Sequence, residues 1–417
     1  MPQNNLIPIL LGTLFLLSCT GANSVYGQVV TLPDIDISAS PNGIVPLPPN
    51  TPAVFREIFS KYTKLIAPNG KPIHFLVQDA WSDDKILKAR NVMEHQLESY
   101  PGSKYGNDKA VVANAMADVK ATMTLFNTSA DANAARTGSL GRGVTDLAMQ
   151  NLWENETTVE GSYDYMNHIT RDASYEEVLH LVQVRGIMNA LPEFQAEIET
   201  AWAAAAAKGW SKDHNNGSNS VEYFAQEFDV YFDLWVVQPK RWEGRDLEPG
   251  EMPEGTAHWG QNAANTRLRL LEIDPAGYGV VTSFFHPYLT YTPQLPVDFE
   301  GTFSIKLDES QVYTHKSQHL RNVTLTGSND ANLTGNRHSN TLIGNSGDNI
   351  LTGGEGDDRI NGSAGSDTAV FSGVYADYEV TTDKGFVAVR DLRLNRDGTD
   401  TLTGVENLQF SDRTIEL

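Results

Sequence analysis

Residues 335–370 read GNRHSNTLIGNSGDNILTGGEGDDRINGSAGSDTAV and divide into four consecutive segments of nine residues. Each segment begins with Gly, and glycine lets a turn adopt positive φ so that its carbonyl groups point inward. An aliphatic residue at the eighth position of each segment can pack into a thin core. The pattern therefore predicts a parallel β-roll with one turn per segment. The sixth positions are Asn340, Asn349, Asp358 and Asp367, and the eighth positions are Leu342, Leu351, Ile360 and Ala369.

The four segments resemble the GGxGxDxUx repeat of the repeats-in-toxin family, the hemolysin-type calcium-binding repeat. The resemblance implies that calcium binds the sixth-position side chains and replaces the hydrophobic core that such polar turns lack. Successive turns lie on opposite edges of the roll, so Asn340 should stack on Asp358 and Asn349 on Asp367, which predicts about two calcium sites. Two sixth positions are Asn, so we expect weaker affinity than in a consensus array. The alternative is a linker rich in Gly, Asn and Asp.

The residues after the repeats, 371–417, alternate between apolar and polar side chains. FVAVRDL (386–392) and ENLQFSD (406–412) read as short strands around an NRDGTDT turn. The stretch DTLTGVENLQFSD resembles the segment that follows the repeats in many secreted members of the same family, in which an uncleaved C-terminal signal serves type I secretion. This resemblance implies an extracellular protein.

The N-terminal residues 1–28 contain an apolar run from Leu6 to Cys19 that predicts a bacterial signal peptide. The run ends in LLSC, which resembles a lipobox and implies that Cys19 is acylated as an outer-membrane lipid anchor. The alternative is cleavage a few residues later, near SVYG, which would discard Cys19. Because Cys19 is the only cysteine, the mature chain has no disulfide in either case.

The net charge of −22 restricts the partners that the chain can bind. Nucleic acids and anionic membrane surfaces require clustered cations, so we expect no nucleic-acid partner. A strongly acidic chain also suits a protein that folds when it meets extracellular calcium, because repulsion between carboxylates keeps the calcium-free repeats open. Calcium ions are therefore the first expected partner.

The composition divides the chain into segments and predicts an α+β fold. A largely helical domain over residues 55–300 carries all seven tryptophans. Within it, KPIHFLVQ (71–78) reads as a strand, and helices are expected at 83–99 and 110–122. The full predicted order is signal peptide 1–28, Pro-rich linker 29–54, domain 55–300, connector 301–326, calcium-binding β-roll 327–370 and C-terminal β segment 371–417.

Two helices of the central domain carry candidate metal ligands. The first, RDASYEEVLHLVQVRGI, is apolar nearly all round except for Glu176, Glu177 and His180, and buried carboxylates need partners or a metal. Glu176 and His180 are four residues apart on one face, which is the HExxH spacing with the first His replaced by Glu. The second helix, NSVEYFAQEFDVYFDLW, brings Glu222, located 42 residues after His180.

ExxxH followed by EYFAQEF resembles the lethal-factor-like gluzincin peptidases, which include the Pro-Pro endopeptidases. The resemblance implies a zincin-like domain in which Glu176, His180 and Glu222 bind zinc and Glu177 is the general base. Glu227 would lie beside the third ligand. The tyrosine that this family places before the third ligand is absent, and Tyr288 or Tyr291 are the candidates to replace it. Two carboxylates and one imidazole also favour harder cations than zinc.

The same residues have a purely structural interpretation. Ser174 and Glu177 match a capping box, Glu176 in a first turn favours the helix dipole, and His180 could be a hydrogen-bonded core residue. Two functions therefore stay open. One is a secreted, calcium-stabilised metallopeptidase that acts on a peptide or protein substrate. The other is a catalytically inactive calcium-binding surface or adhesive module.

Overall fold

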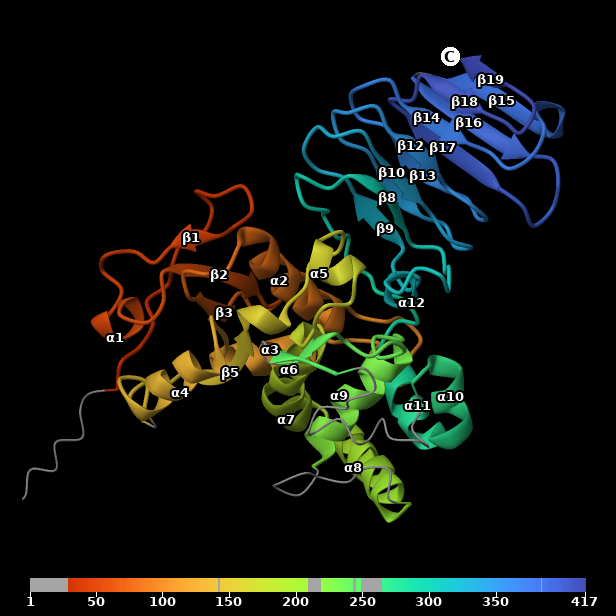
Figure 1. Cartoon of the computed structure of the whole chain (residues 1–417). Coiled ribbons are helices and arrows are strands. Elements are labelled where there is room, and N and C mark those ends of the chain that lie inside the picture. Colours follow the sequence, from red (N-terminus) through yellow and green to blue (C-terminus); the bar gives the residue numbers. More distant parts are fainter. Residues whose placement is uncertain (1–28, 142, 209–218, 243–244, 249–264, 384) are drawn as a thin grey trace, which may run out of the picture.

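The computed structural model describes residues 29–417 except 142, 209–218, 243–244, 249–264 and 384. A helical central region with its own sheet is followed by a C-terminal β-roll that projects from it (Figure 1). The α+β prediction is confirmed at this level. The signal peptide and the lipobox at Cys19 lie outside the described residues. None of the described helices is both long and apolar enough to cross a bilayer.

The central region contains a five-stranded sheet in which the strands follow one another in chain order. The first three strands pair antiparallel and the last three pair parallel. The strand expected at 71–78 is present, but the helix expected at 110–122 ends at Asp118, and ATMTLF forms a strand instead. Its six residues are buried, as expected of a central parallel strand. The strands are β1 (Val45–Pro46), β2 (Lys61–Ile66), β3 (Pro72–Val77), β4 (Ala121–Phe126) and β5 (Ala148–Trp153).

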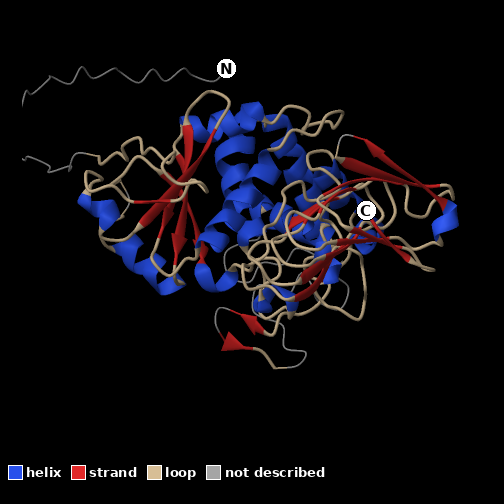
Figure 2. Ribbon diagram, turned by 90° about the horizontal axis from the view of Figure 1, so that it is seen from above, coloured by secondary structure: helices blue, strands red, loops and turns tan. Residues whose placement is uncertain are grey.

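Most helices gather on one side of this sheet (Figure 2). Helix α2 begins after Ser82, whose side chain accepts a hydrogen bond from the backbone N–H of Lys85. Helix α6 packs against α2, α9 and β5, and continues directly into a π-helix, Val182–Ile187. The helices are α1 (Ala53–Arg56), α2 (Asp83–Leu97), α3 (Ala110–Asp118), α4 (Ser129–Thr137), α5 (Tyr163–Met166), α6 (Ser174–Leu181), α7 (Met188–Ala190), α8 (Pro192–Ala207), α9 (Ser220–Tyr231), α10 (Arg267–Ile273), α11 (Pro275–Thr282) and α12 (Thr314–Ser317).

The Pro-rich residues 29–54, expected to form an extended linker, pack against the central region. Val45 and Pro46 pair with β2, and Val30 forms a parallel bridge with Thr145. Ile35 is buried in a second apolar cluster on the sheet. Prolines are compatible with this position because an edge strand does not need all of its N–H groups for pairing.

The roll consists of two facing sheets built from parallel rungs (Figure 1). The chain alternates between the sheets, so each strand pairs with the strand two turns away, as Leu342 with Ile360 and Leu351 with Ala369. All four eighth-position residues are buried, which confirms the thin aliphatic core. One sheet has β8 (Gly301–Ser304), β10 (Ala331–Thr334), β12 (Ile350–Thr352), β14 (Thr368–Val370), β18 (Asn407–Gln409) and β19 (Thr414–Glu416); the other has β9 (Asn322–Thr324), β11 (Thr341–Ile343), β13 (Arg359–Asn361), β17 (Thr399–Thr403), β16 (Phe386–Asp391) and β15 (Tyr378–Asp383).

The parallel rungs extend beyond the four repeats at both ends. The expected connector supplies β8 and β9, which pair parallel with β10 and β11. After the repeats, β17 pairs parallel with β13 and β18 with β14. The residues between β14 and β17 interrupt the parallel rungs and form an antiparallel hairpin of β15 and β16, which joins the edge of one sheet because β16 pairs antiparallel with β17. The last part of the chain therefore continues the roll after an interruption.

Candidate metal centres

The sixth-position side chains of the repeats form two columns, one on each edge of the roll. The backbone N–H of Asn340 donates to Asp358 Oδ1 at 2.7 Å, and that of Asn349 donates to Asp367 Oδ1 at 2.7 Å. The stacking expected from the sequence is therefore observed.

Both columns continue with acids that the repeat pattern does not include. The N–H of Asp358 donates to Asp400 Oδ1 at 2.9 Å, and the N–H of Asp367 donates to Glu406 Oε2 at 2.8 Å. One column therefore runs Asn340, Asp358 and Asp400, while the other runs Asn349, Asp367 and Glu406. Each becomes more acidic toward the C-terminal end.

The aspartates of both columns are buried. Asp358 Oδ2 and Asp367 Oδ2 are buried and have no hydrogen-bond partner within the described part of the chain. Burial, together with repulsion from neighbouring carboxylates, raises the pKa of Asp358 to about 7 and that of Asp400 to about 9. Unpaired buried carboxylate oxygens fit a hard cation with oxygen ligands, such as calcium.

Asp400 was not predicted from the sequence as a member of a column, because residues 371–397 interrupt the nine-residue period. The signal is nevertheless present: GTDTL (398–402) repeats the Gly-x-Asp-x-aliphatic pattern of GDDRI (356–360). Gly398 has φ +71°, and a Cβ atom there would lie 1.9 Å from the carbonyl oxygen of Gly356. Only glycine fits this stacked turn, as in the repeats themselves.

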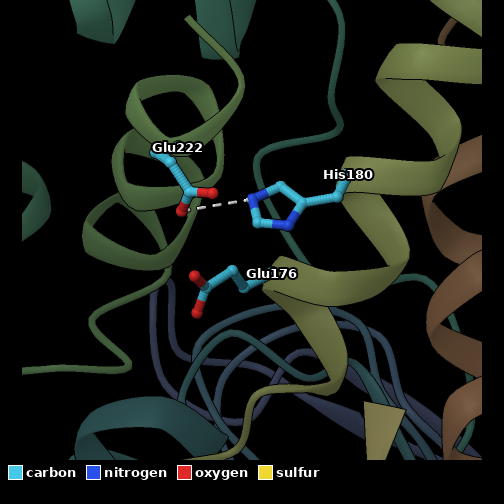
Figure 3. Close-up of side chains that lie close together, drawn as sticks. All are labelled: Glu176, His180 and Glu222. Carbon is cyan, nitrogen blue, oxygen red and sulfur yellow. Dashed lines mark ion pairs between the residues drawn. The ribbon is translucent and has the colours of Figure 1, made fainter. Parts of the chain in front are cut away.

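The second candidate centre lies between helices α6 and α9 of the central region (Figure 3). Glu176 and His180 project from α6 and Glu222 projects from α9, and their nearest ligand atoms all lie within 4.8 Å of one another. His180 Nε2 is 3.6 Å from Glu222 Oε2. Asn219 begins α9 by accepting hydrogen bonds from the backbone of Val221 and Glu222, which fixes the first turn. The structure thus brings together the three residues selected from the sequence.

His180 is held with one ring nitrogen available to a ligand. Its Nδ1 is 3.4 Å from Glu177 Oε2, and the same oxygen accepts a hydrogen bond of 2.6 Å from Gln150 Nε2. His180 Nε2 is buried and lacks a hydrogen-bond partner among the described residues. A carboxylate at Nδ1 and an open Nε2 is the arrangement of metal-binding histidines, so the residues present fit a divalent metal ion.

Acidic groups set the electrostatics around His180. Although burial alone lowers the pKa of His180, the hydrogen bond and charge of Glu177 and the charges of Glu176 and Glu222 raise it to about 9. Burial raises the pKa of Glu222. Burial also opposes ionisation of Glu177, but His180 and Arg171 outweigh it and lower the pKa of Glu177. The cluster therefore attracts a cation.

Arg171 compensates part of this negative charge. Its guanidinium donates a hydrogen bond to Glu176 Oε2 and lies 3.7 Å from Glu156 Oε2. Asp229, on the same helix as Glu222, accepts a hydrogen bond of 2.9 Å from Trp235 Nε1. Because Oε2 of Glu176 accepts the hydrogen bond from Arg171, a metal ion would bind the other oxygen of Glu176.

The remaining residues proposed by resemblance lie elsewhere. Glu227 points toward α11, where a Cβ on Gly277 would lie 2.6 Å from Glu227 Oε2. Tyr291 donates to Glu160 at 2.7 Å within a separate buried cluster. The Ser174–Glu177 capping box is not formed, because helix α6 has no side-chain cap and Ser174 Oγ donates to Asp172 instead.

Comparison with known proteins identifies the repeats. The model of the RTX calcium-binding nonapeptide repeat matches four copies over residues 334–369. These residues are RTX calcium-binding repeats. A search of curated proteins found no match to the chain. The family match ends before Asp400 and Glu406 and does not include the central region, so the Glu176–His180–Glu222 centre depends on its geometry alone.

Proposed function

We propose that the chain is a secreted, calcium-stabilised metallopeptidase whose central region binds a divalent metal through Glu176, His180 and Glu222. The observation that carries the proposal is the buried His180 Nε2, which has no hydrogen-bond partner in the described part of the chain and faces two carboxylates. An unpaired polar atom in a buried position is costly unless a ligand satisfies it. When bound, such an ion acts as a Lewis acid and lowers the pKa of a coordinated water.

Glu177 has two roles in this proposal. Its Oε2 lies 3.4 Å from His180 Nδ1, and by accepting a hydrogen bond from Nδ1 of the neutral imidazole it would leave Nε2 free to bind the metal. The hydrogen bonds of the Glu177 side chain to other described residues use Oε2. Its Oε1 is therefore the atom that can accept a proton from the attacking water. Gln150 keeps this carboxylate in place through the other hydrogen bond.

Calcium has a structural role in the same proposal. It binds the columns in which Asn340 and Asn349 stack on Asp358 and Asp367, and it binds most tightly where these aspartates meet Asp400 and Glu406. RTX repeats are typical of secreted bacterial proteins, and calcium outside the cell would complete the roll.

Metal analysis and peptide cleavage test the central proposal together. Purified full-length protein saturated with calcium should contain about one additional divalent ion per chain. His180→Ala should lose this ion, whereas His315→Ala, a matched change outside the cluster, should keep it. Glu177→Gln should retain the metal and lose cleavage of a casein or proline-rich peptide substrate, because the proton acceptor is removed.

The second candidate function is a calcium-binding surface or adhesive module without catalysis. The ion pair between Arg171 and Glu176 favours it, because an arginine bound to a ligand carboxylate competes with a metal ion. Wild-type protein with calcium only, no further ion and no cleavage would support this second function and contradict the first.

A further inference from the structure

A cavity of about 340 Å³ lies where the roll joins the central region. The first RTX turn contributes Asn336, Arg337 and His338 to its wall. The central region contributes Arg267, and His319 lies two residues beyond helix α12. The cavity is thus built from both parts of the molecule. It does not include the Glu176–His180–Glu222 centre, but it adjoins the start of one calcium column, because Asn336 exchanges hydrogen bonds with Asn340.

The charge of this cavity is opposite to that of the chain. Arg267, Lys306 and Arg337 line it, and Glu355 is the one acidic residue among the lining residues. The whole chain, in contrast, has 53 acidic and 31 basic residues. Three cations facing one acid create a positive potential that a small anion would reduce.

A hydrogen bond and ring stacking position Arg267. The Arg267 guanidinium lies 3.9 Å from the ring centre of Tyr231 and its Nη2 is 3.1 Å from His319 Nδ1. Asp233 Oδ2 is 2.8 Å from His319 Nε2 and orients the imidazole. Asp233 therefore compensates part of the charge near Arg267 and His319, while the side chains of Lys306 and Arg337 are exposed.

A fourth cation lies directly behind the cavity wall. The guanidinium of Arg321 stacks 4.0 Å from the ring centre of Tyr288, which lines the cavity. Arg321 Nε is buried and lacks a hydrogen-bond partner within the described residues. Burial and the nearby charges of Arg321, Arg337 and Arg267 together lower the pKa of His338, which agrees with a positive local field.

We propose that this cavity binds a small organic anion, with a carboxylate held by Arg337 and Lys306 and an apolar body against the exposed side chains of Pro287 and Leu307. Guanidinium groups match the planar geometry of a carboxylate, and the apolar side chains on the wall accommodate the carbon skeleton. The site is independent of the proposed peptidase activity, because none of its residues belongs to the Glu176–His180–Glu222 centre.

Calorimetric titration of succinate into the calcium-saturated full-length protein tests the proposal. At constant ionic strength we expect a dissociation constant of about 1 mM or below. Arg337→Gln and Lys306→Gln should each weaken binding roughly tenfold, because each removes one charge-assisted contact. Both side chains are exposed, so these variants should fold. Arg359→Gln, an exposed change on the same roll outside the cavity, should bind like wild type.

Three results would overturn the proposal. The first is no succinate binding up to about 20 mM. The second is an equal loss of affinity in Arg359→Gln and Arg337→Gln, which would indicate diffuse attraction by surface charge. The third is equally strong binding of neutral succinamide. Sulfate should bind more weakly than succinate, because it lacks a carbon skeleton to contact Pro287 and Leu307. Equal affinity would contradict the organic part of the proposal.

Discussion

Replacing Asp400 by Asn should have opposite effects on the roll in the absence and the presence of calcium. Asp400 accepts the backbone hydrogen bond of Asp358 through Oδ1, and an asparagine oxygen can accept the same bond. Asn340 and Asn349 already occupy equivalent positions in the two columns. The substitution therefore removes the ionisable group and preserves the stacked turn.

The pKa of Asp400 sets the magnitude of the calcium-free effect. Burial and repulsion raise this pKa from 3.8 to about 9. Between pH 3.8 and about 9, Asp400 is ionised in the unfolded chain but protonated in the folded roll, which destabilises the folded roll by about 1.4 kcal/mol for each pH unit above 3.8. At pH 7.5, Asp400→Asn should therefore stabilise the calcium-free roll by at most about 5 kcal/mol. With calcium the same change removes a ligand. A hundredfold loss of affinity would then reduce the calcium-dependent gain in stability by about 2.7 kcal/mol.

Urea denaturation followed by far-ultraviolet circular dichroism, with chelator and with saturating calcium, measures both effects. The difference in free energy of unfolding between the two conditions should be smaller in Asp400→Asn than in wild type. Asp383→Asn, an exposed change on β15, is the control and should leave this difference unchanged. An equal difference in wild type and Asp400→Asn would refute the conclusion that Asp400 contributes to a calcium site.

Two further predictions concern charge burial. In chelator, the free energy of unfolding of the roll should fall as the pH rises from about 4 to about 9. Asp358 and Asp400 have raised pKa values in the folded roll, so the folded state binds more protons than the unfolded state over this range. Calcium should remove this trend, and a rise in stability over that range in chelator would contradict the prediction. Lys88→Met should lower the free energy of unfolding of the calcium-bound protein by about 3 to 5 kcal/mol, because it leaves Glu160 buried without its cation. Lys71→Met, which breaks an exposed ion pair, should cost about 1 kcal/mol or less, and equal losses would show that burial does not determine the effect.

The sequence was most informative where one short pattern repeats. The spacing of glycine, sixth-position and eighth-position residues predicted the rungs, the inward side chains and the stacking of Asn340 on Asp358. A strand was predicted at 406–412, where β18 lies, but the parallel pairing of β8, β9, β17 and β18 with the repeats was not, because strands of three to five residues have no clear periodicity of their own. These strands are stabilised by pairing with the repeats, so tertiary contacts and not the local sequence determine where they form.

In the central region, too, features that depend on tertiary contacts could not be predicted from the local sequence. β4 is buried along its whole length, so its apolar run could not be distinguished from the end of the preceding helix. The four-residue spacing of Glu176 and His180 placed both on one face, the EYFAQEF helix supplied Glu222 as the third candidate, and the structure brings the three together. Arg171 and Gln150 were not predicted, because their contacts with Glu176 and Glu177 depend on how β5 and α6 pack.

The antiparallel strands at the end of the roll also limit how far it can grow. A stack of parallel rungs has no built-in length, and its last strands expose N–H and C=O groups to which another chain could add. Here the last parallel strands, β17 and β18, are covered by β16 and β19, which run in the opposite direction. The outer strand β15 then presents mostly exposed polar residues. The polar outer strand β15 thereby gives one sheet of the roll an edge that disfavours the addition of a strand from another chain.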